Sequence, residues 1–534
     1  MTTTLSQLAS GCGGTVVPPS AADVRVDGIE INAGQVRPGG VFAAVPGTRA
    51  HGARYAGQSD GAAVLTDRAG LDILLADAEA EGRAAAPVIV VDDVRAVLGH
   101  VAAEIHGHPS RELTVIGVTG TSGKTTTTYL LEGALHAAGH VVGRIGTTGT
   151  SIGGHPVPSS LTTPEAPALQ RLFRQMVDEG ATHVVMEVSS HALSLGRVDG
   201  VDFDVTCFLN LSQDHLDFHD TLDEYFDAKA RLFRADSPLR APCAVVCVDD
   251  RWGRRMAGIA EAPGVTVDTV STADNVRDDE GERDDAPRAA TWTAGHAEVA
   301  DNGVQTAPLT GPDGAVALRV GLPGSFNVAN AAVAWAALSA AGCATESALD
   351  GMAGVAVPGR MERVDRGQDF LAVVDYAHKP AAIGAVLATL RGQTPGRVIA
   401  VVGAGGDRDA GKRPMMGAEA ARAADVVIVT DDNPRSEDPA LIRDAVAAGA
   451  EVEAAHLRAA GRPVPEIRVV DGRAAAIGAA VAAAATGDAV IVCGKGHETG
   501  QEIAGVVHHF DDREELARAL DQRAAGDDGK ETRR

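Results

Sequence analysis

Short apolar runs alternate with longer alanine-rich segments along most of this chain. An apolar run bounded by turn residues is typical of a buried strand, and regular alternation of such strands with helices predicts parallel sheets. The segment 125–138 carries apolar residues at helical spacing. Strands are predicted at 40–45, 87–91, 113–118, 183–188, 205–209, 370–374, 398–402, 426–430 and 489–493. The pattern therefore predicts an α/β fold.

The length of 534 residues predicts about three domains, at a typical size of about 150 residues each. Turn-rich segments at Gly107-His-Pro-Ser110 and Val357-Pro-Gly-Arg360 separate them. We expect an N-terminal domain at 1–108, a central P-loop mononucleotide-binding α/β domain at 109–356 and a C-terminal Rossmann-like α/β domain at 357–534. The charge-dense segment 274–288 predicts an exposed loop or hairpin insertion.

Charge and composition exclude several classes of partner. A net charge of −25 argues against a general nucleic-acid or anionic-membrane surface, so we expect no nucleic-acid partner. Since no apolar stretch reaches about 18 residues and no signal peptide is recognisable, we expect no membrane insertion and a cytoplasmic location. The six cysteines are scattered, and Cys243 and Cys247 have no second pair that would complete a zinc site. Reduced structural thiols are the prediction.

A glycine-rich turn with phosphate-binding chemistry lies at Gly117-Val-Thr-Gly-Thr-Ser-Gly-Lys-Thr-Thr126, between a predicted strand and a predicted helix. Backbone N–H groups and the helix N-terminus attract phosphate there. Lys124 can reach the outer phosphates, and the Thr125 hydroxyl can bind Mg²⁺. Val118 stands where the usual pattern has glycine, so the loop is a variant form. We expect ATP and Mg²⁺ to bind here.

Further polar clusters follow predicted strands. Met186-Glu-Val-Ser-Ser-His191 and 210–219 bring carboxylates and imidazoles beside the P-loop, where they could bind metal or could satisfy the backbone at the strand ends. In the last domain, four clusters at 375–378, 403–408, 432–435 and 494–498 each follow a strand. Because the carboxyl ends of parallel strands share one edge of a sheet, these clusters predict a ligand site.

Six motifs, in order, resemble those of the Mur ligases, and the resemblance covers the whole chain. Within that family the chain is most similar to the ligases that add the third residue of the cell-wall peptide. The motifs are Thr119-Gly-Thr-Ser-Gly-Lys-Thr125, Met186-Glu-Val-Ser-Ser-His191, Asp214-His-Leu-Asp217, Tyr225-Phe-Asp-Ala-Lys229, Phe326-Asn-Val-Ala-Asn330 and Gly405-Gly-Asp-Arg-Asp409.

The resemblance implies two Mg²⁺ sites, one held by Thr125 and Glu187 and the other by Glu187, His215 and Lys229. It also implies that Lys229 carries a carbamate derived from CO₂, because an ammonium repels a cation whereas a carbamate offers oxygen. Without the resemblance, Lys229 would be interpreted as a solvated helix lysine. Together with Lys124, these residues form the predicted catalytic set.

The resemblance further implies an ATP site. The nucleotide contacts are Thr119, Gly120, Thr121, Ser122, Gly123, Lys124 and Thr125 on the loop, Asn327 and Asn330 near adenine, and Arg360 and Asp375 at the phosphates and ribose. Asn327 and Asn330 lie on one helix face and could equally cap or brace that helix.

The implied partners are UDP-N-acetylmuramoyl-L-alanyl-D-glutamate and meso-diaminopimelate. We expect the protein to be a monomer. The predicted muramyl-peptide contacts are Thr162, Thr163, Ser189 and Arg197, and the uridine contacts are Ile31, Ala33, Thr48, Arg49 and Ala50. Ala33 replaces a serine usual in relatives. The predicted diaminopimelate contacts are Arg408, Asp432, Asn433, Pro434, Arg435, Gly494 and Glu498.

The resemblance implies amide-bond formation in peptidoglycan precursor synthesis: the D-glutamate carboxylate attacks the γ-phosphate of ATP, and the diaminopimelate amine displaces phosphate from the acyl phosphate. Arg435 supports this specificity, because a guanidinium pairs with the distal carboxylate of diaminopimelate and repels the ammonium of lysine. An ordinary turn is the alternative for residues 432–435. Two other functions stay open: a folylpolyglutamate synthase-type ligase, and a P-loop regulator that performs no ligation.

Overall fold

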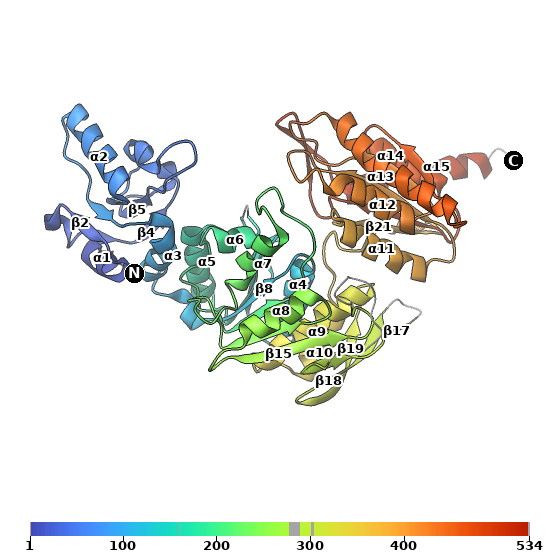
Figure 1. Cartoon of the computed structure of the whole chain (residues 1–534), viewed down its shortest axis with the longest axis horizontal. Coiled ribbons are helices and arrows are strands. Elements are labelled where there is room, and N and C mark those ends of the chain that lie inside the picture. The colour runs from blue at the N-terminus through green and yellow to red at the C-terminus, as the bar shows by residue number, and fades with distance from the viewer. Residues whose placement is uncertain (1, 160, 277–288, 301–303, 532–534) are drawn as a thin grey trace.

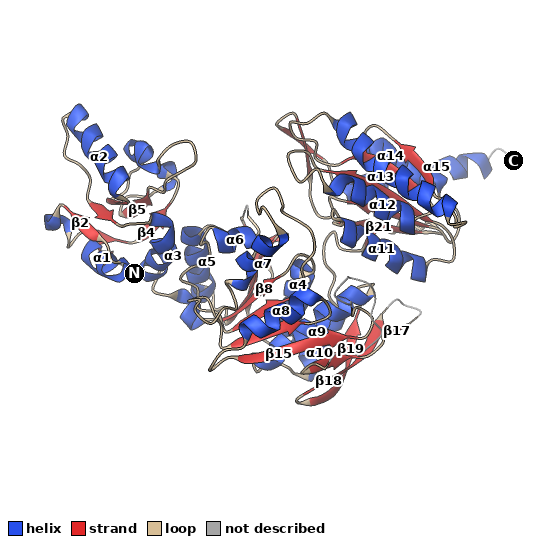
Figure 2. Cartoon of the chain, in the orientation of Figure 1, coloured by secondary structure: helices blue, strands red, loops and turns tan. Residues whose placement is uncertain are grey.

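The computed structural model describes residues 2–159, 161–276, 289–300 and 304–531 and confirms the predicted α/β class. Three large sheets follow one another along the chain, each covered by helices (Figures 1 and 2). In Figure 1 the first sheet lies to the left of the second, and the third lies to its upper right. Most of the predicted insertion at 274–288 falls outside the described residues.

The first sheet has five strands in the order β2-β7-β6-β5-β4. All pairs are parallel except β2 with β7. The segment 31–33 follows β4, and the loop 46–51 follows β5, so both lie at the same sheet edge. The bounds are β2 (Thr15–Val17), β4 (Gly28–Glu30), β5 (Gly40–Ala43), β6 (Ala63–Thr66) and β7 (Val88–Val90), with helices α1 (Leu5–Cys12), α2 (Arg68–Glu81) and α3 (Val94–Ile105).

The second sheet has a parallel centre, β9-β12-β8-β13-β14-β15-β16, extended by antiparallel strands at both ends. Strands β8, β12 and β13 of the parallel centre were predicted, whereas its other strands and the antiparallel ends were not. The antiparallel strands are short or half exposed and carry no buried apolar run. The strands are β8 (Thr114–Thr119), β9 (Val142–Gly146), β10 (Gly149–Ile152), β11 (His155–Val157), β12 (His183–Glu187), β13 (Val205–Phe208), β14 (Cys243–Cys247), β15 (Thr266–Thr272), β16 (Trp292–Ala294), β17 (Glu298–Val299), β18 (Gln305–Gly311) and β19 (Gly314–Val320).

Helices cover both faces of this second sheet. One face packs against α4 (Lys124–Ala137), α9 (Ser325–Ala340) and α10 (Glu346–Ala353). The other packs against α5 (Ala166–Asp178), α7 (Leu222–Ala230) and α8 (Arg251–Ala260), with the short α6 (Ser190–Ser194) beside α7. Two continuous apolar cores therefore hold the central strands rigidly.

The third sheet has the order β20-β21-β25-β22-β23-β24 and is parallel except for β20. Its four predicted strands are present as β21, β22, β23 and β25. The bounds are β20 (Glu362–Arg363), β21 (Leu371–Asp375), β22 (Val398–Ala404), β23 (Val426–Asp431), β24 (Glu466–Val469) and β25 (Ala489–Cys493), with helices α11 (Pro380–Gln393), α12 (Lys412–Ala423), α13 (Pro439–Ala459), α14 (Arg473–Ala483) and α15 (Asp512–Glu531).

Helices α11, α12 and α13 cover one face of the third sheet, and α14 and α15 the other. None of the helices in the described part of the chain combines the length and the apolar character that crossing a bilayer requires.

Candidate active site

The P-loop joins β8 to α4 at the carboxyl edge of the central sheet. Gly123 is the N-cap of α4 and has φ of 90°, a left-handed conformation that favours glycine. A Cβ atom at this position would lie 2.3 Å from Oδ1 of Asn330, so the close approach of α9 also demands glycine. The loop backbone is braced by Asn210, whose Oδ1 accepts from the Ser122 N–H at 3.0 Å. The turn is thus held open by a left-handed glycine and a side-chain brace.

Lys124 folds back over this loop. Its Nζ donates to the carbonyl oxygens of Gly120 and Thr121 at 2.9 and 3.1 Å. Desolvation, aided by the charge of Lys379, lowers the pKa of Lys124 to about 8. A phosphate arriving at the loop would replace the two carbonyl contacts with a charge-assisted bond.

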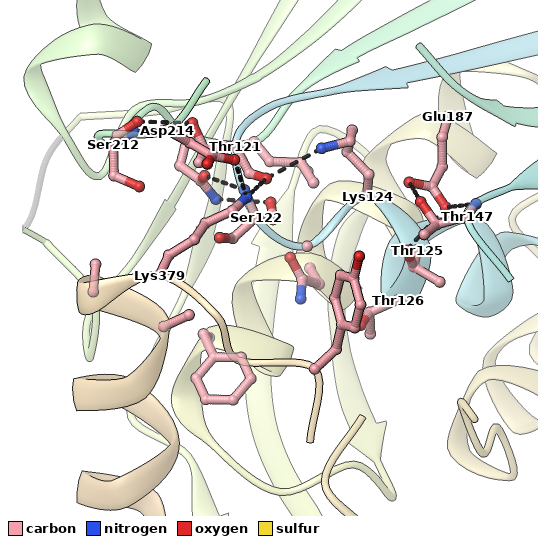
Figure 3. Close-up of a pocket in the computed structure, with 18 of the residues that line it drawn as sticks. Thr121, Ser122, Lys124, Thr125, Thr126, Thr147, Glu187, Ser212, Asp214 and Lys379 are labelled. Carbon is pink, nitrogen blue, oxygen red and sulfur yellow. Dashed lines mark hydrogen bonds and ion pairs between the residues drawn. The ribbon is translucent and has the colours of Figure 1, made fainter. Parts of the chain in front are cut away.

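The oxygen-bearing side chains of Thr125, Thr147 and Glu187 meet next to the P-loop (Figure 3). Glu187 ends β12, is 1% exposed, and accepts from the Thr125 hydroxyl at 2.9 Å through Oε1. Thr147, which follows β9, donates to the same carboxylate through its N–H at 2.8 Å and its hydroxyl at 3.0 Å. Hard oxygen donors at this spacing suit Mg²⁺, so Thr125 and Glu187 fit the metal site predicted for them.

The predicted muramyl-peptide residues continue directly from this carboxylate. The Thr163 hydroxyl donates to the backbone oxygen of Glu187 at 2.8 Å, and the Thr162 and Thr147 hydroxyls lie 3.2 Å apart. Arg197 donates to the Thr163 carbonyl at 3.3 Å. The hydroxyl oxygens of Ser189 and Thr163 lie 3.4 Å apart. All four predicted residues are therefore gathered beside the Thr125–Glu187 pair.

A buried ion pair crosses from the third sheet to the P-loop. Lys379, just before α11, places Nζ 2.8 Å from Oδ2 of Asp214 and donates to the Thr121 carbonyl at 3.0 Å. Lys412 is 3.9 Å from the same carboxylate. These lysines hold the pKa of Asp214 far below its usual value, although burial alone would raise it. The pair fastens the C-terminal unit onto the nucleotide loop.

His215 adjoins this pair in a left-handed backbone conformation, with φ of 55°. Its Nε2 lies 3.1 Å from Oδ2 of Asp214. Desolvation inside the cavity lowers the pKa of His215 to about 2, so the imidazole is neutral and has a lone pair for a metal. Positive φ outside glycine is uncommon and clusters at functional sites.

Lys229 lies behind the P-loop rather than on the cavity wall. It is 1% exposed, donates to the Gly120 carbonyl at 3.0 Å, and lies 4.5 Å from the centre of the Tyr225 ring. Burial, with help from the neighbouring Lys124 and Lys379 charges, lowers its pKa well below the usual value. The simple interpretation as a solvated lysine is therefore wrong, and a neutral amine is the form that reacts with CO₂.

Asn327 and Asn330 lie on the first turns of α9 and line the cavity. Asn330 donates to Asn327 at 3.1 Å, and Asn327 donates to the Pro323 carbonyl at 2.8 Å. They brace the start of the helix, as one sequence interpretation held, and they also face the space next to the P-loop. The two interpretations are compatible.

A cavity of about 730 Å³ joins these groups to the C-terminal unit. Arg360 stacks on the Tyr376 ring at 4.2 Å and donates to the Thr125 hydroxyl at 3.3 Å. Asp375 accepts from two backbone N–H groups at 2.7 Å, and burial raises its pKa. Arg408 also lines the cavity, 3.9 Å from Asp217. Of the predicted loop residues, 121–125 line this space, whereas Thr119 and Gly120 lie behind it.

A second cluster lies on the C-terminal sheet alone. Asn433 donates to Oε2 of Glu498 at 3.0 Å, and the fully buried Lys495 donates to Oδ1 of Asn433 at 2.9 Å. Gly494 is so close to Asp432 that a Cβ atom would lie 2.9 Å from Oδ2 of Asp432. The two strand-end loops at 432–435 and 494–498 therefore contact each other and form one wall of side chains at the same edge of the sheet.

Arg435 projects from that wall with a left-handed backbone, φ of 53°. Its N–H donates to the Glu502 carbonyl at 3.0 Å, and its guanidinium donates to the Gly406 carbonyl at 2.6 Å. The residue after Pro434 is thus held by hydrogen bonds to Glu502 and Gly406.

The structure does not bring all predicted residues to one cavity. Six predicted diaminopimelate residues, Asp432, Asn433, Pro434, Arg435, Gly494 and Glu498, are not among the residues that line it. The predicted uridine residues Ile31, Ala33, Thr48, Arg49 and Ala50 lie in the segments that follow β4 and β5. Figure 1 shows these two strands apart from β8 and α4, which flank the P-loop.

Sequence reasoning missed four residues that organise the site: Asn210, Thr147, Lys379 and Lys495. Lys379, Asn210 and Lys495 lie in or next to polar clusters that follow strands, which was a usable signal. Thr147 had none, because a single threonine after a short strand is unremarkable until Glu187 is placed beside it.

Comparison with known proteins identifies two matching domains in the chain. Residues 118–338 match the family model for the Mur ligase middle domain, and residues 359–496 match the model described as Mur ligase, glutamate ligase domain. A Corynebacterium glutamicum protein named UDP-N-acetylmuramoyl-L-alanyl-D-glutamate--2,6-diaminopimelate ligase is 57% identical over 487 residues, covering 90% of this chain and 89% of that protein.

Solved structures agree. One of a protein with that same name has 31% identity and a TM-score of 0.65, covering 98% of this chain and 100% of the other. A Mycobacterium tuberculosis folylpolyglutamate synthase complexed with ADP and AMPPCP has 19% identity and a TM-score of 0.59, covering 75% of this chain and 92% of the other. At that identity the likeness shows a shared fold alone.

Proposed function

The chain belongs to the Mur ligase family of ATP-dependent ligases, and from that premise we propose that it adds meso-diaminopimelate to UDP-N-acetylmuramoyl-L-alanyl-D-glutamate. The observation that carries this proposal is the single cavity of about 730 Å³ in which the P-loop, the Thr125–Glu187 pair, Thr162–Thr163 and the C-terminal Arg408 all face one another. Such a space suits a triphosphate and a carboxylate that must react together.

The proposed reaction has two steps. The terminal carboxylate of the D-glutamate residue attacks the γ-phosphorus, the bond to ADP breaks, and an acyl phosphate forms. The amine of diaminopimelate then attacks the acyl carbon and displaces inorganic phosphate. Positioning and charge neutralisation supply the acceleration in such a transfer, and no protein nucleophile is needed.

Lys124 is proposed to neutralise the outer phosphates, since its ammonium already lies over the loop that would hold them. Arg360 and Arg408 add positive charge from the C-terminal side of the cavity. Asn327 and Asn330 are proposed to border the adenine, with Asp375 at the ribose. His215, being neutral, is better suited as a metal ligand than as a general base.

Mg²⁺ would be held by the Thr125 hydroxyl and the Glu187 carboxylate, with a second ion at Glu187, His215 and a carbamylated Lys229, and would offset the repulsion between carboxylate and triphosphate. The fit of Thr125 and Glu187 rests on oxygens 2.9 Å apart. The carbamate proposal rests on a buried lysine whose contacts among the described residues are a carbonyl and a ring, with no carboxylate bonded to it.

Amino-acid specificity is proposed for the wall formed by residues 432–435 and 494–498. Arg435 would pair with the distal carboxylate of diaminopimelate, and Glu498 would receive its distal amine. Burial and the neighbouring Asp432 charge raise the pKa of Glu498, so the pocket would gain from an incoming ammonium. Arg408 and Pro434 complete this proposed subsite.

The remaining contacts are assigned to the muramyl nucleotide. Thr162, Thr163, Ser189 and Arg197 are proposed for the peptide, and residues 31–33 and 48–50 for the uridine end. We place domain boundaries at 1–108, 109–356 and 357–534, since each range holds one of the three large sheets. Movement of the last domain toward the cavity would carry the Arg435 wall to the reacting carboxylate.

The test is ADP release by the purified full-length chain with ATP, Mg²⁺ and the UDP-dipeptide, comparing meso-diaminopimelate with L-lysine. We expect turnover only when both the UDP-dipeptide and diaminopimelate are present. Equal or better use of lysine would refute the specificity. ADP release without either acceptor would instead favour a nucleotide-driven regulator, and activity on a folate substrate would favour a folylpolyglutamate synthase.

A further inference from the structure

Two imidazoles and a thiol converge at the edge of the central sheet opposite the P-loop. His183 begins β12, the strand whose other end carries Glu187. Cys343 Sγ lies 3.4 Å from Nε2 of His183 and 3.9 Å from Nε2 of His140. The three donor atoms all lie within 4.8 Å of one another, and no other such group of histidine, cysteine or acidic side chains occurs among the described residues.

Helix ends position two of these side chains in the same way. After α4, the Gly139 N–H donates to the His136 carbonyl and the His140 N–H donates to the Leu135 carbonyl. The corresponding bonds after α9 run from Gly342 to Ser339 and from Cys343 to Leu338. Each glycine has positive φ, so both ends are Schellman motifs, which fix the residue that follows the glycine. His140 and Cys343 are therefore placed by the backbone and not by each other.

The hydrogen bonds around His183 favour the tautomer in which Nε2 presents a lone pair to the thiol. The Thr182 hydroxyl donates to the Val141 carbonyl at 3.4 Å, which leaves its oxygen free to accept from Nδ1–H of His183 at 2.8 Å. Nε2 of His183 is then unprotonated and points toward Cys343 Sγ. A histidine whose other nitrogen is held in this way is oriented as metal ligands are.

We propose that His140, His183 and Cys343 form a binding site for a zinc-class divalent ion. In tetrahedral zinc, bonds of about 2.3 Å to sulfur and about 2.0–2.1 Å to nitrogen place sulfur and nitrogen about 3.6 Å apart. The two observed sulfur–nitrogen distances, 3.4 and 3.9 Å, bracket that value. Three protein ligands leave the fourth position for water, and His140 is half exposed, which gives access from solvent.

The surroundings favour a cation of this class. The carboxyl ends of α4 and α9 both meet the cluster, and each carries partial negative charge. Thiolate and imidazole are ligands for zinc-class ions, whereas Mg²⁺ prefers oxygen, so the ion serving the nucleotide would not compete here. Binding converts the Cys343 thiol to a thiolate and releases its proton to water.

The bound ion would stabilise the central domain and would take no part in the ligase reaction. Helix α4 has 14 residues and therefore holds the cluster about 20 Å from the P-loop. The ion would tie together α4, α9 and β12, which are the three elements that carry Lys124, Asn330 and Glu187 at their opposite ends. Its expected effect is a more stable central domain.

The experiment uses the full-length protein, stripped of metal with a chelator and returned to buffer with excess Mg²⁺. Zinc affinity is measured by competition with a chromogenic chelator, and Co²⁺ is added separately as a spectroscopic probe. We expect one zinc per chain, a thiolate-to-cobalt charge-transfer band, and a rise in Tm with zinc. Cys343→Ser should weaken zinc binding by at least about 100-fold, because the loss of outer contacts alone costs roughly 10–100-fold.

The control is Cys243→Ser, which removes a half-buried thiol of the same domain that lies outside the cluster and should bind zinc as the parent does. His140→Asn, at the half-exposed position, repeats the test if Cys343→Ser fails to fold. Zinc affinity unchanged in both variants, or cobalt bound without the thiolate band, would overturn the proposal and leave a simple thiol–imidazole hydrogen bond. Neither readout depends on ligase activity, so failure of the proposed function would be distinguishable.

Discussion

Replacing Lys379 with methionine should weaken the attachment of the C-terminal unit to the P-loop. The Lys379 and Asp214 side chains are 10% and 4% exposed, with Nζ and Oδ2 2.8 Å apart. Removal of Lys379 leaves Asp214 beside the neutral His215, with Lys412 at 3.9 Å as its remaining cationic neighbour in the described salt bridges. Breaking a buried pair by removing one partner costs about 3–5 kcal/mol. Because Lys412 remains, we expect about 3 kcal/mol.

The assay is a double-mutant cycle on urea unfolding, with Lys379→Met, Asp214→Asn and the double variant. The double variant no longer buries an unpaired carboxylate, so it should recover about 2 kcal/mol relative to the sum of the single changes. The matched control is Arg366→Met. Arg366 pairs with Asp521 at 2.6 Å but is about half exposed, so its loss should lower the free energy of unfolding far less than the loss of Lys379.

The same pair gives the sign of a pH effect. The folded pKa of Asp214 lies below the ordinary value of 3.8, so its ionised form contributes stability above that pH. This contribution is lost as pH falls through the range below 3.8, and Lys379→Met should therefore lose less stability on acidification than the parent. In the double-mutant cycle, additivity of Lys379→Met and Asp214→Asn within about 0.5 kcal/mol would refute an energetic coupling between the two side chains.

Three further predictions concern the ligand sites. Arg435→Lys should raise the KM for diaminopimelate roughly 10–100-fold, since a lost charge-assisted bond is worth about 1.5–3 kcal/mol; steady-state kinetics should show the KM for ATP unchanged, and a parallel rise in both would contradict the assignment. Lys229→Met should remove a carbamate signal seen by ¹³C NMR with labelled bicarbonate and lower kcat at least about 100-fold, whereas a parent protein without the signal would contradict the carbamate. Nucleotide binding should take up protons as pH rises above about 8, because bound phosphate favours the charged form of Lys124, whose pKa is about 8 in the free protein. Calorimetry in buffers of different ionisation enthalpy measures this uptake, which Lys124→Arg should abolish; persistent uptake in that variant would assign it to another group.

Local sequence was sufficient for the most apolar strands and for the P-loop. Apolar runs predicted β8, β12 and β13 of the central sheet, and the Gly123-Lys-Thr125 pattern predicted the turn and the start of α4. These features depend on backbone sterics and on side-chain periodicity within a few residues, which a sequence displays directly. Strand β16 and the antiparallel strands β17 to β19 were not predicted, because their pairing partners, and not their own composition, determine them.

Metal-site chemistry illustrates the same division. Only the resemblance predicted Thr125 and Glu187 as joint ligands of one Mg²⁺. Thr147, the third residue of that cluster, is identified only by the pairing of β9 with β12, which places it against Glu187. His140, His183 and Cys343 gave no spacing pattern, and cysteine spacing alone argued against a zinc site. Their proximity arises from two helix ends and a strand meeting at one sheet edge.

The sequence alone therefore determined the α/β class, the strand-to-helix phosphate loop and the family resemblance. Tertiary structure decided which charges are buried against each other, including Lys379 with Asp214 and Lys495 with Asp432. The physical reason is range: short segments choose their conformation from local sterics, whereas desolvation and ion pairing depend on neighbours that only the packed sheets and helices bring together.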